Sequence, residues 1–161
     1  MRFTVVIAVI ASAISCASAQ TNAPLDKPRR IRGLKQYEAM EKAIAPYVAK
    51  ARATYPTAKK RFLAGLPSNY LFTVWLPFDE DDKKTGEYRQ EYVFVIVDKI
   101  SGRKVYGRIN NKILALKTYR LGDRVQFAES RILNWCIVRP DGSEEGNYVG
   151  NFLDYWRPPK G

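Results

Sequence analysis

The sequence predicts an α+β domain in which an N-terminal helical segment packs on a curled antiparallel sheet of five or six strands. Residues 34–66 carry apolar side chains at helical spacing, and from residue 70 onward the apolar residues alternate in short runs separated by turn residues. A helical part that precedes the strands, instead of alternating with them, is typical of the α+β class. These patterns leave strand order and barrel closure open.

One apolar stripe runs along the predicted helical segment, and prolines interrupt it. Pro46 removes a backbone donor, which predicts a kink or a break at that point. Thr54 and Pro56 predict the cap and first turn of a second helical stretch, which Pro67 ends. The stripe consists of Met40, Ala43, Ile44, Tyr47, Val48 and Ala51.

The first strand is predicted at residues 70–78, where side chains alternate and Pro77 marks the exit. Residues 79–82 are consecutive acids. Because such a run of like charge is hard to pack, we expect residues 79–86 to form a mobile hairpin connection.

A central hairpin over residues 91–111 is the strongest strand signal in the chain. Residues 93–97 are apolar on both faces, which predicts a strand in the middle of the sheet. A turn at residues 101–102 follows. The returning strand then places three side chains on its outward face: Lys104, Tyr106 and Arg108.

The remaining chain is predicted to add shorter elements. Residues 112–120 should be irregular, and residues 125–127 should form a short strand. A last hairpin should pair residues 132–138 with residues 147–153 across a turn at Pro140.

The N-terminus has the parts of a secretory signal peptide over residues 1–19. Arg2 precedes an apolar run, and the small residues 17–19 predict cleavage before Gln20. Cys16 leaves lipoprotein processing as the alternative. We expect a periplasmic or secreted protein without a transmembrane segment in its mature chain. It should consist of a disordered basic tether (20–33), a single domain (34–156) and a tail (157–161).

Cys136 is the one cysteine left after that cleavage, which excludes an internal disulfide. Its apolar neighbours Trp135 and Ile137 favour a buried thiol over a reactive one. The net charge of the whole chain is +11, and cleavage removes Arg2 and no acid, so the mature chain carries 11 − 1 = +10. This excess favours an anionic envelope component or an acidic protein as partner, ahead of nucleic acid. Improved solubility alone is the competing explanation.

The sequence contains no histidine, which removes the usual general base and the usual zinc ligand. The acids at 79–82 lack the alternating spacing and the glycine of a calcium loop, so no metal or other cofactor is expected. A hydrolase that uses two carboxylates on an envelope polymer stays open as an alternative. Its candidate residues are Glu91, Asp98, Asp123 and Glu129.

Four segments together resemble the YegJ-like family of small bacterial domains of unknown function. They are an acid before an apolar strand (91–95), a glycine strand that ends in asparagine (107–111), a Gly-Asp turn (122–127) and a tryptophan that closes the core (132–135). The resemblance spans residues 40–152 and implies a compact α+β domain without an established activity. The chain departs from the family pattern at Tyr92, Ile113 and Asn134, which stand in place of a histidine, a proline and an aspartate.

Taken together, the residues favour an exported binding or interaction module of the bacterial envelope over an enzyme. The candidate binding surface lies around the central hairpin, where bases flank a tyrosine, and the resemblance adds an asparagine and a tryptophan. Stacking and charge attraction together suit an anionic partner. The candidate binding residues are Arg103, Lys104, Tyr106, Arg108, Asn111, Lys112 and Trp135.

Overall fold

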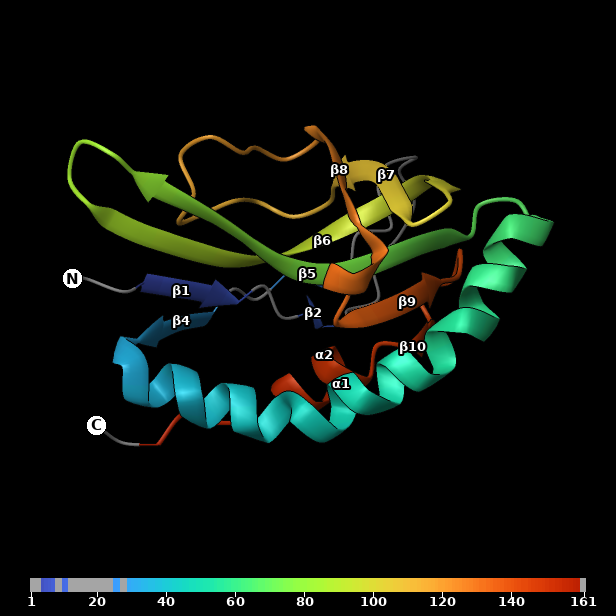
Figure 1. Ribbon diagram of the computed structural model, residues 1–161. Coiled ribbons are helices and arrows are strands. Elements are labelled where there is room, and N and C mark those ends of the chain that lie inside the picture. Colours follow the sequence, from blue (N-terminus) through green and yellow to red (C-terminus); the bar gives the residue numbers. More distant parts are fainter. Residues whose placement is uncertain (1–3, 8–9, 12–24, 27–28, 160–161) are drawn as a thin grey trace.

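A computed structural model describes residues 4–7, 10–11, 25–26 and 29–159, and it confirms the α+β class. A long helix, α1 (Gly33–Ala64), crosses one side of an open, curled sheet (Figure 1). A short helix, α2 (Tyr148–Leu153), lies between them. No helix within the described ranges is both long and apolar enough to cross a membrane.

Within the described residues the main sheet has eight strands. Six of them form one continuous antiparallel arrangement, whose outer strands do not pair with each other. Their order is β10-β9-β5-β6, and β7 and then β8 continue from the second half of β6. Their bounds are β5 Leu71–Asp82, β6 Glu87–Ser101, β7 Lys104–Ile109, β8 Arg124–Ala128, β9 Asn134–Val138 and β10 Glu144–Gly146. A 3-10 turn, η1 (Glu129–Arg131), joins β8 to β9.

The N-terminal part contributes four short strands. β1 (Thr4–Ile7) runs parallel to the start of β6 and pairs on its other side with β4 (Arg29–Arg32). β2 (Ile10–Ala11) pairs with β3 (Leu25–Asp26) as a separate ribbon. The expected cleavage site before Gln20 and the alternative at Cys16 lie outside the described residues, as does much of the expected tether.

The predicted break in the helix is wrong, because α1 runs continuously through Pro46 and Pro56. Both prolines lie on the exposed side, where water can satisfy the carbonyls that lose a partner, and α1 curves along its length (Figure 1). Thr54 is not a cap: its hydroxyl donates to the carbonyls of Lys50 and Ala51, at 2.9 and 3.2 Å. The buried stripe continues past the prolines as Met40, Ile44, Ala51, Tyr55 and Ala58.

Alternation along β5 separates two apolar clusters. Phe72, Val74, Leu76 and Phe78 pack with the second half of α1. Trp75 points the other way and packs with the first half of α1 and with α2. The helix therefore contributes to both clusters, which explains why its burial continues beyond Pro46.

The central hairpin is confirmed, with β6 buried on both faces over much of its length and β7 returning beside it. Gly107 is required where the hairpin bends, because an added Cβ would lie 2.2 Å from the carbonyl oxygen of Ile96. Cys136 is also buried as predicted, and burial raises the pKa of its thiol. The thiol is therefore protected both from solvent and from ionisation.

The acidic segment is not a mobile connection, which corrects the prediction for residues 79–86. β5 continues to Asp82, so the turn between β5 and β6 is confined to residues 83–86. Alternation puts only Glu80 and Asp82 on one face, where Glu80 lies opposite Arg89 of β6. Pairing across the sheet thus separates charges that are adjacent in the sequence.

The last hairpin is also different from the prediction. β9 pairs with β10, and residues 148–153 form α2 instead of a strand. Gly146 and Asn147 both have positive φ, at 88° and 47°, and this reverses the chain. Val149 and Leu153 then lie one helical turn apart and are both buried.

Candidate functional site

A row of bases lies on the outward face of β6, β7 and β8. Its β7 members, Lys104 and Arg108, are exposed as the sequence predicts, whereas Lys99 of β6 and Arg124 of β8 were not among the predicted binding residues. We call this row the cationic strip. Lys99 lies opposite Tyr106, and Arg108 lies opposite Arg124, so three neighbouring strands contribute to one surface. Lys104 precedes them at the start of β7. The strip consists of Lys99, Lys104, Arg108 and Arg124, with Tyr106 half-buried at its centre.

One member of the cationic strip is already neutralised. The guanidinium of Arg108 donates from Nε to both oxygens of Asp98, at 3.2 Å, and from Nη2 to Oδ1, at 3.0 Å. Within the described part of the chain, Lys99, Lys104 and Arg124 form no ion pair, and all three are exposed. These three side chains therefore remain free for an anionic partner.

Of the other predicted binding residues, two are exposed near this surface and two are buried. Arg103 is exposed in the turn before β7, and Lys112 is exposed beyond its end. Asn111 is buried, and its side-chain oxygen accepts from the backbone N–H of Phe94 at 2.8 Å, in place of a strand partner. Trp135 is buried too, and its indole N–H donates to the Ala51 carbonyl and the Thr54 hydroxyl. Both have core contacts, and their binding roles stay predictions.

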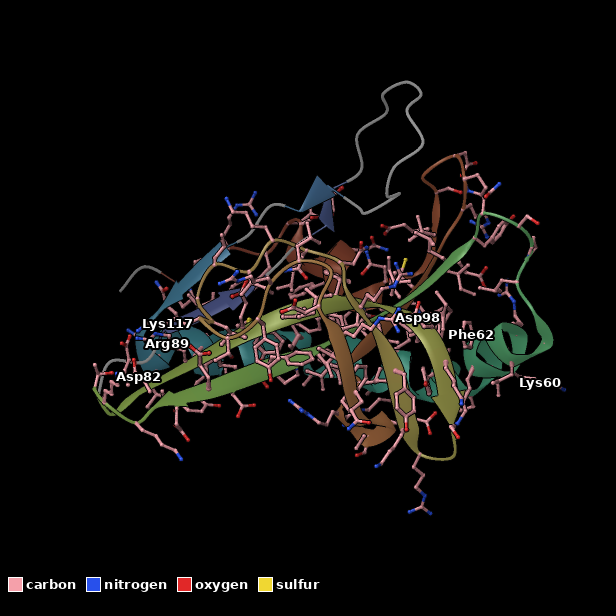
Figure 2. The ribbon with its side chains drawn as sticks, turned by 90° about the horizontal axis from the view of Figure 1, so that it is seen from above. Lys60, Phe62, Asp82, Arg89, Asp98 and Lys117 are labelled. Carbon is pink, nitrogen blue, oxygen red and sulfur yellow. The ribbon has the colours of Figure 1, made fainter. Side chains whose placement is uncertain are left out.

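A second charged group, which we call the bonded end, lies where β5 and β6 meet the following loop. Figure 2 shows Arg89, Asp82 and Lys117 together at the tip of the β5–β6 ribbon. Arg89 pairs with Glu80 and Asp82, at 3.5 and 3.4 Å, and with Glu87.

Glu80 also anchors the loop that follows β7. Its carboxylate accepts from the backbone of Lys117 and from both donors of Thr118. Burial raises the pKa of Glu80, but these bonds and Arg89 outweigh that effect and hold it below its usual range. The charges of the bonded end are thus satisfied within the fold.

Glu91 completes the bonded end from inside the sheet. It is fully buried, and its carboxylate accepts from three successive backbone N–H groups, at 3.0 Å from Leu114, 2.7 Å from Ala115 and 3.4 Å from Leu116. Burial raises its pKa, and the three bonds oppose that shift without cancelling it. Glu91 therefore holds residues 112–120 against the sheet as a structural anchor.

The remaining catalytic candidates occupy separate places. Asp98 pairs with Arg108, and Asp123 accepts from the Arg120 backbone at 2.8 Å in the turn before β8. Among the described residues, no group of histidine, cysteine and acidic side chains has the arrangement to hold a metal ion. The structure thus does not bring Glu91, Asp98 and Asp123 together as an acid pair.

Glu129 lies in a pocket that sequence reasoning missed. The pocket has a volume of about 280 Å³ and opens between α1 and η1. We call it the α1–η1 pocket. The sequence indicates Glu129 only as a candidate catalytic carboxylate, and it gives no local signal that Tyr55 lies beside it. Its lining residues are Ala51, Arg52, Tyr55, Glu129, Ser130, Ile132 and Leu133.

The fold and these surfaces define a small α+β domain with an open sheet, a basic outward face and a tightly bonded acidic end. The chain belongs to a family described as an uncharacterized protein conserved in bacteria (DUF2314), whose model matches residues 36–154. This confirms the expected bacterial domain of unknown function, although the match does not extend to the YegJ-like label. No curated protein and no solved structure matches the chain.

Two positions that depart from the expected pattern have structural partners. The hydroxyl of Tyr92 donates to Glu41, and the amide of Asn134 donates to the Asn147 side-chain oxygen at 2.9 Å. Both residues are buried. The contacts account for Tyr92 and for the amide nitrogen of Asn134, while Oδ1 of Asn134 is buried without a hydrogen-bond partner among the described residues.

Proposed function

We propose that this domain is an exported binding module of the bacterial cell envelope that recognises an anionic partner or surface through the cationic strip. The carrying observation is that Lys99, Lys104 and Arg124 converge from three strands on one face and have no ion pair in the part of the chain that the structure describes. The net charge, which is 11 − 1 = +10 after the expected cleavage, adds a long-range attraction to anionic partners.

Binding is favoured over hydrolysis because the candidate acids already have other partners. A two-carboxylate mechanism needs two acids that face each other across a cleft. Glu91 is bonded to a loop, Asp98 to Arg108 and Asp123 to a turn. Glu129 lines the α1–η1 pocket, and the described residues that line this pocket include no second acid.

The strip is tested with the double variant Lys104→Glu/Arg124→Glu and vesicles of phosphatidylglycerol in phosphatidylcholine. Each exposed charge contact contributes only about 0–1 kcal/mol, so binding needs several contacts and should weaken as salt rises from low to physiological concentration. We expect the variant to lose most of its cosedimentation with the vesicles at both salt concentrations. Circular dichroism checks that the fold is retained.

The matched control is Lys42→Glu/Lys60→Glu, which makes the same change in net charge at two exposed positions on α1. It should bind nearly as well as the wild type if the location of the charge matters. If both double variants lost vesicle binding equally, net charge and not the location of the strip would explain the binding. Retention of binding in the strip variant would remove the strip from the proposal.

Asp98→Asn provides a test in the opposite direction. It frees Arg108 from its carboxylate partner and adds one positive charge to the strip. Stronger vesicle binding than in the wild type is the expected result.

Export is tested separately by the intact mass of the protein recovered outside the cytoplasm. A chain that begins at Gln20 supports the signal peptide. A lipid-bearing chain that begins at Cys16 would replace it with the anchored alternative.

A further inference from the structure

The α1–η1 pocket combines an apolar wall with charged and neutral polar groups. Ala51 and Ile132 are buried beside it, and Arg52 extends from the exposed side of α1. The Nε of Arg52 donates to the carbonyl of Ile132 at 3.3 Å, which links the two sides. At about 280 Å³ the pocket is near the small end of ligand sites, so it suits a ligand with a single ring.

Tyr55 places an incompletely bonded hydroxyl in this pocket. The residue is 9% exposed, and its buried Oη meets the Glu129 carboxylate without good hydrogen-bond geometry and has no better partner among the described residues. Burial raises the pKa of the phenol, and the charge and the hydrogen bond of Glu129 raise it further, so the hydroxyl stays protonated. Most buried polar groups in proteins are well bonded, so this hydroxyl keeps bonding capacity that a ligand can use.

The charges around the pocket do not cancel. Glu129 Oε1 lies 2.6 Å from Lys59 Nζ, so its negative charge is already compensated. Arg52 forms no ion pair within the described ranges and adds one positive charge in excess. A ligand ammonium would have to compete with Lys59, whereas a single negative charge would complement Arg52.

We propose that the α1–η1 pocket binds a small hydroxylated carboxylate, the chemistry of a single sugar-acid unit. The ligand carboxylate pairs with Arg52, one ligand hydroxyl completes the bonding of Tyr55, and another donates to Glu129. The apolar face of the ring lies against Ile132 and Leu133. This goes beyond the proposed function because the pocket uses none of the strip residues.

Calorimetric titration of the full chain with glucuronate tests the assignment, and NMR shifts at pocket residues locate the binding. Glucose lacks the charge and acetate lacks the hydroxyls, so each should bind at least about tenfold more weakly than glucuronate. Arg52→Gln should weaken glucuronate binding about tenfold or more, and Tyr55→Phe should weaken it about fivefold.

Two controls separate this site from other effects. Lys60→Gln removes an exposed charge from the same helix without touching the pocket, and Lys104→Glu/Arg124→Glu alters only the strip. Both should bind glucuronate like the wild type. The proposal is overturned if glucuronate gives no saturable signal, if glucose binds equally well, or if the folded Arg52→Gln and Tyr55→Phe variants both keep wild-type affinity.

Discussion

The bonded end and the α1–η1 pocket both bring acids close to bases, but they differ in how completely their polar atoms are bonded. At the bonded end, Glu80 and Glu91 accept several hydrogen bonds each, and Arg89 pairs with more than one carboxylate. In the pocket, the buried hydroxyl of Tyr55 meets the Glu129 carboxylate without good hydrogen-bond geometry, and it has no better partner among the described residues.

This difference distinguishes polar groups that stabilise the fold from polar groups that can still bind a ligand. A buried polar group that finds a partner within the chain stabilises the fold or costs little, whereas one without a partner costs about 1–3 kcal/mol. The bonded end attaches residues 112–120 to the sheet. The pocket keeps a cost that a ligand could remove, which makes it the better place to look for binding.

The largest effect is expected from Glu91→Ala, which leaves three backbone donors of one loop without their acceptor. We expect the free energy of unfolding in urea to fall by about 3 kcal/mol. Glu91→Gln is the control, since it keeps one acceptor oxygen and should lose less. If both variants stay within about 0.5 kcal/mol of the wild type, Glu91 is not the anchor.

A pair of tyrosine variants compares a well-bonded hydroxyl directly with a poorly bonded one. Tyr92→Phe removes the bond to Glu41 and should lower the free energy of unfolding by about 1.5 kcal/mol. Tyr55→Phe removes a hydroxyl whose contact with Glu129 is poorly aligned, so it should change the free energy of unfolding by less than about 0.5 kcal/mol. Equal destabilisation in both variants would show that Tyr55 is bonded in solution and would weaken the case for the pocket.

The smallest effect is a difference in pH dependence between the two anchoring carboxylates. The pKa of Glu80 is lowered in the folded protein. Its ionisation therefore contributes to the stability of the fold above about pH 4.5, and this contribution is lost as pH falls through the lowered pKa. The pKa of Glu91 is raised, so its contribution to stability is present below about pH 4.5 and is lost as pH rises through the raised pKa.

Urea unfolding of the wild type, Glu80→Gln and Glu91→Gln between pH 3 and pH 7 measures these two contributions. The stability difference between the wild type and Glu80→Gln should grow with rising pH, and the difference for Glu91→Gln should shrink. Slopes of the same sign would contradict the assignment of opposite shifts.

Local periodicity was enough to predict the parts of the fold that depend on one segment at a time. Alternation placed Lys104, Tyr106 and Arg108 on one face, and apolar neighbours placed Cys136 in the core. The class of fold and the central hairpin followed from the same short-range patterns. A two-residue or four-residue period is a property of neighbouring residues, so it survives in the sequence.

The site could be predicted only in part, because its contacts join distant segments. The sequence suggested Arg108 as a free base, but the fold brings Asp98 beside it across the hairpin. It suggested Asn111 and Trp135 as binding residues, and the fold gives each a buried partner elsewhere in the chain. Nothing in the sequence around Asn111 or Trp135 indicates these partners.

The sequence by itself therefore determined the α+β class, the central hairpin, the outward bases and the buried thiol. Only the tertiary structure decided that α1 continues through its prolines, that the acids of β5 pair across the sheet, and that Tyr55 meets Glu129 in a pocket. The physical reason is that burial of a continuous face outweighs the local cost of a proline, and that a charge is neutralised by whatever the fold places beside it.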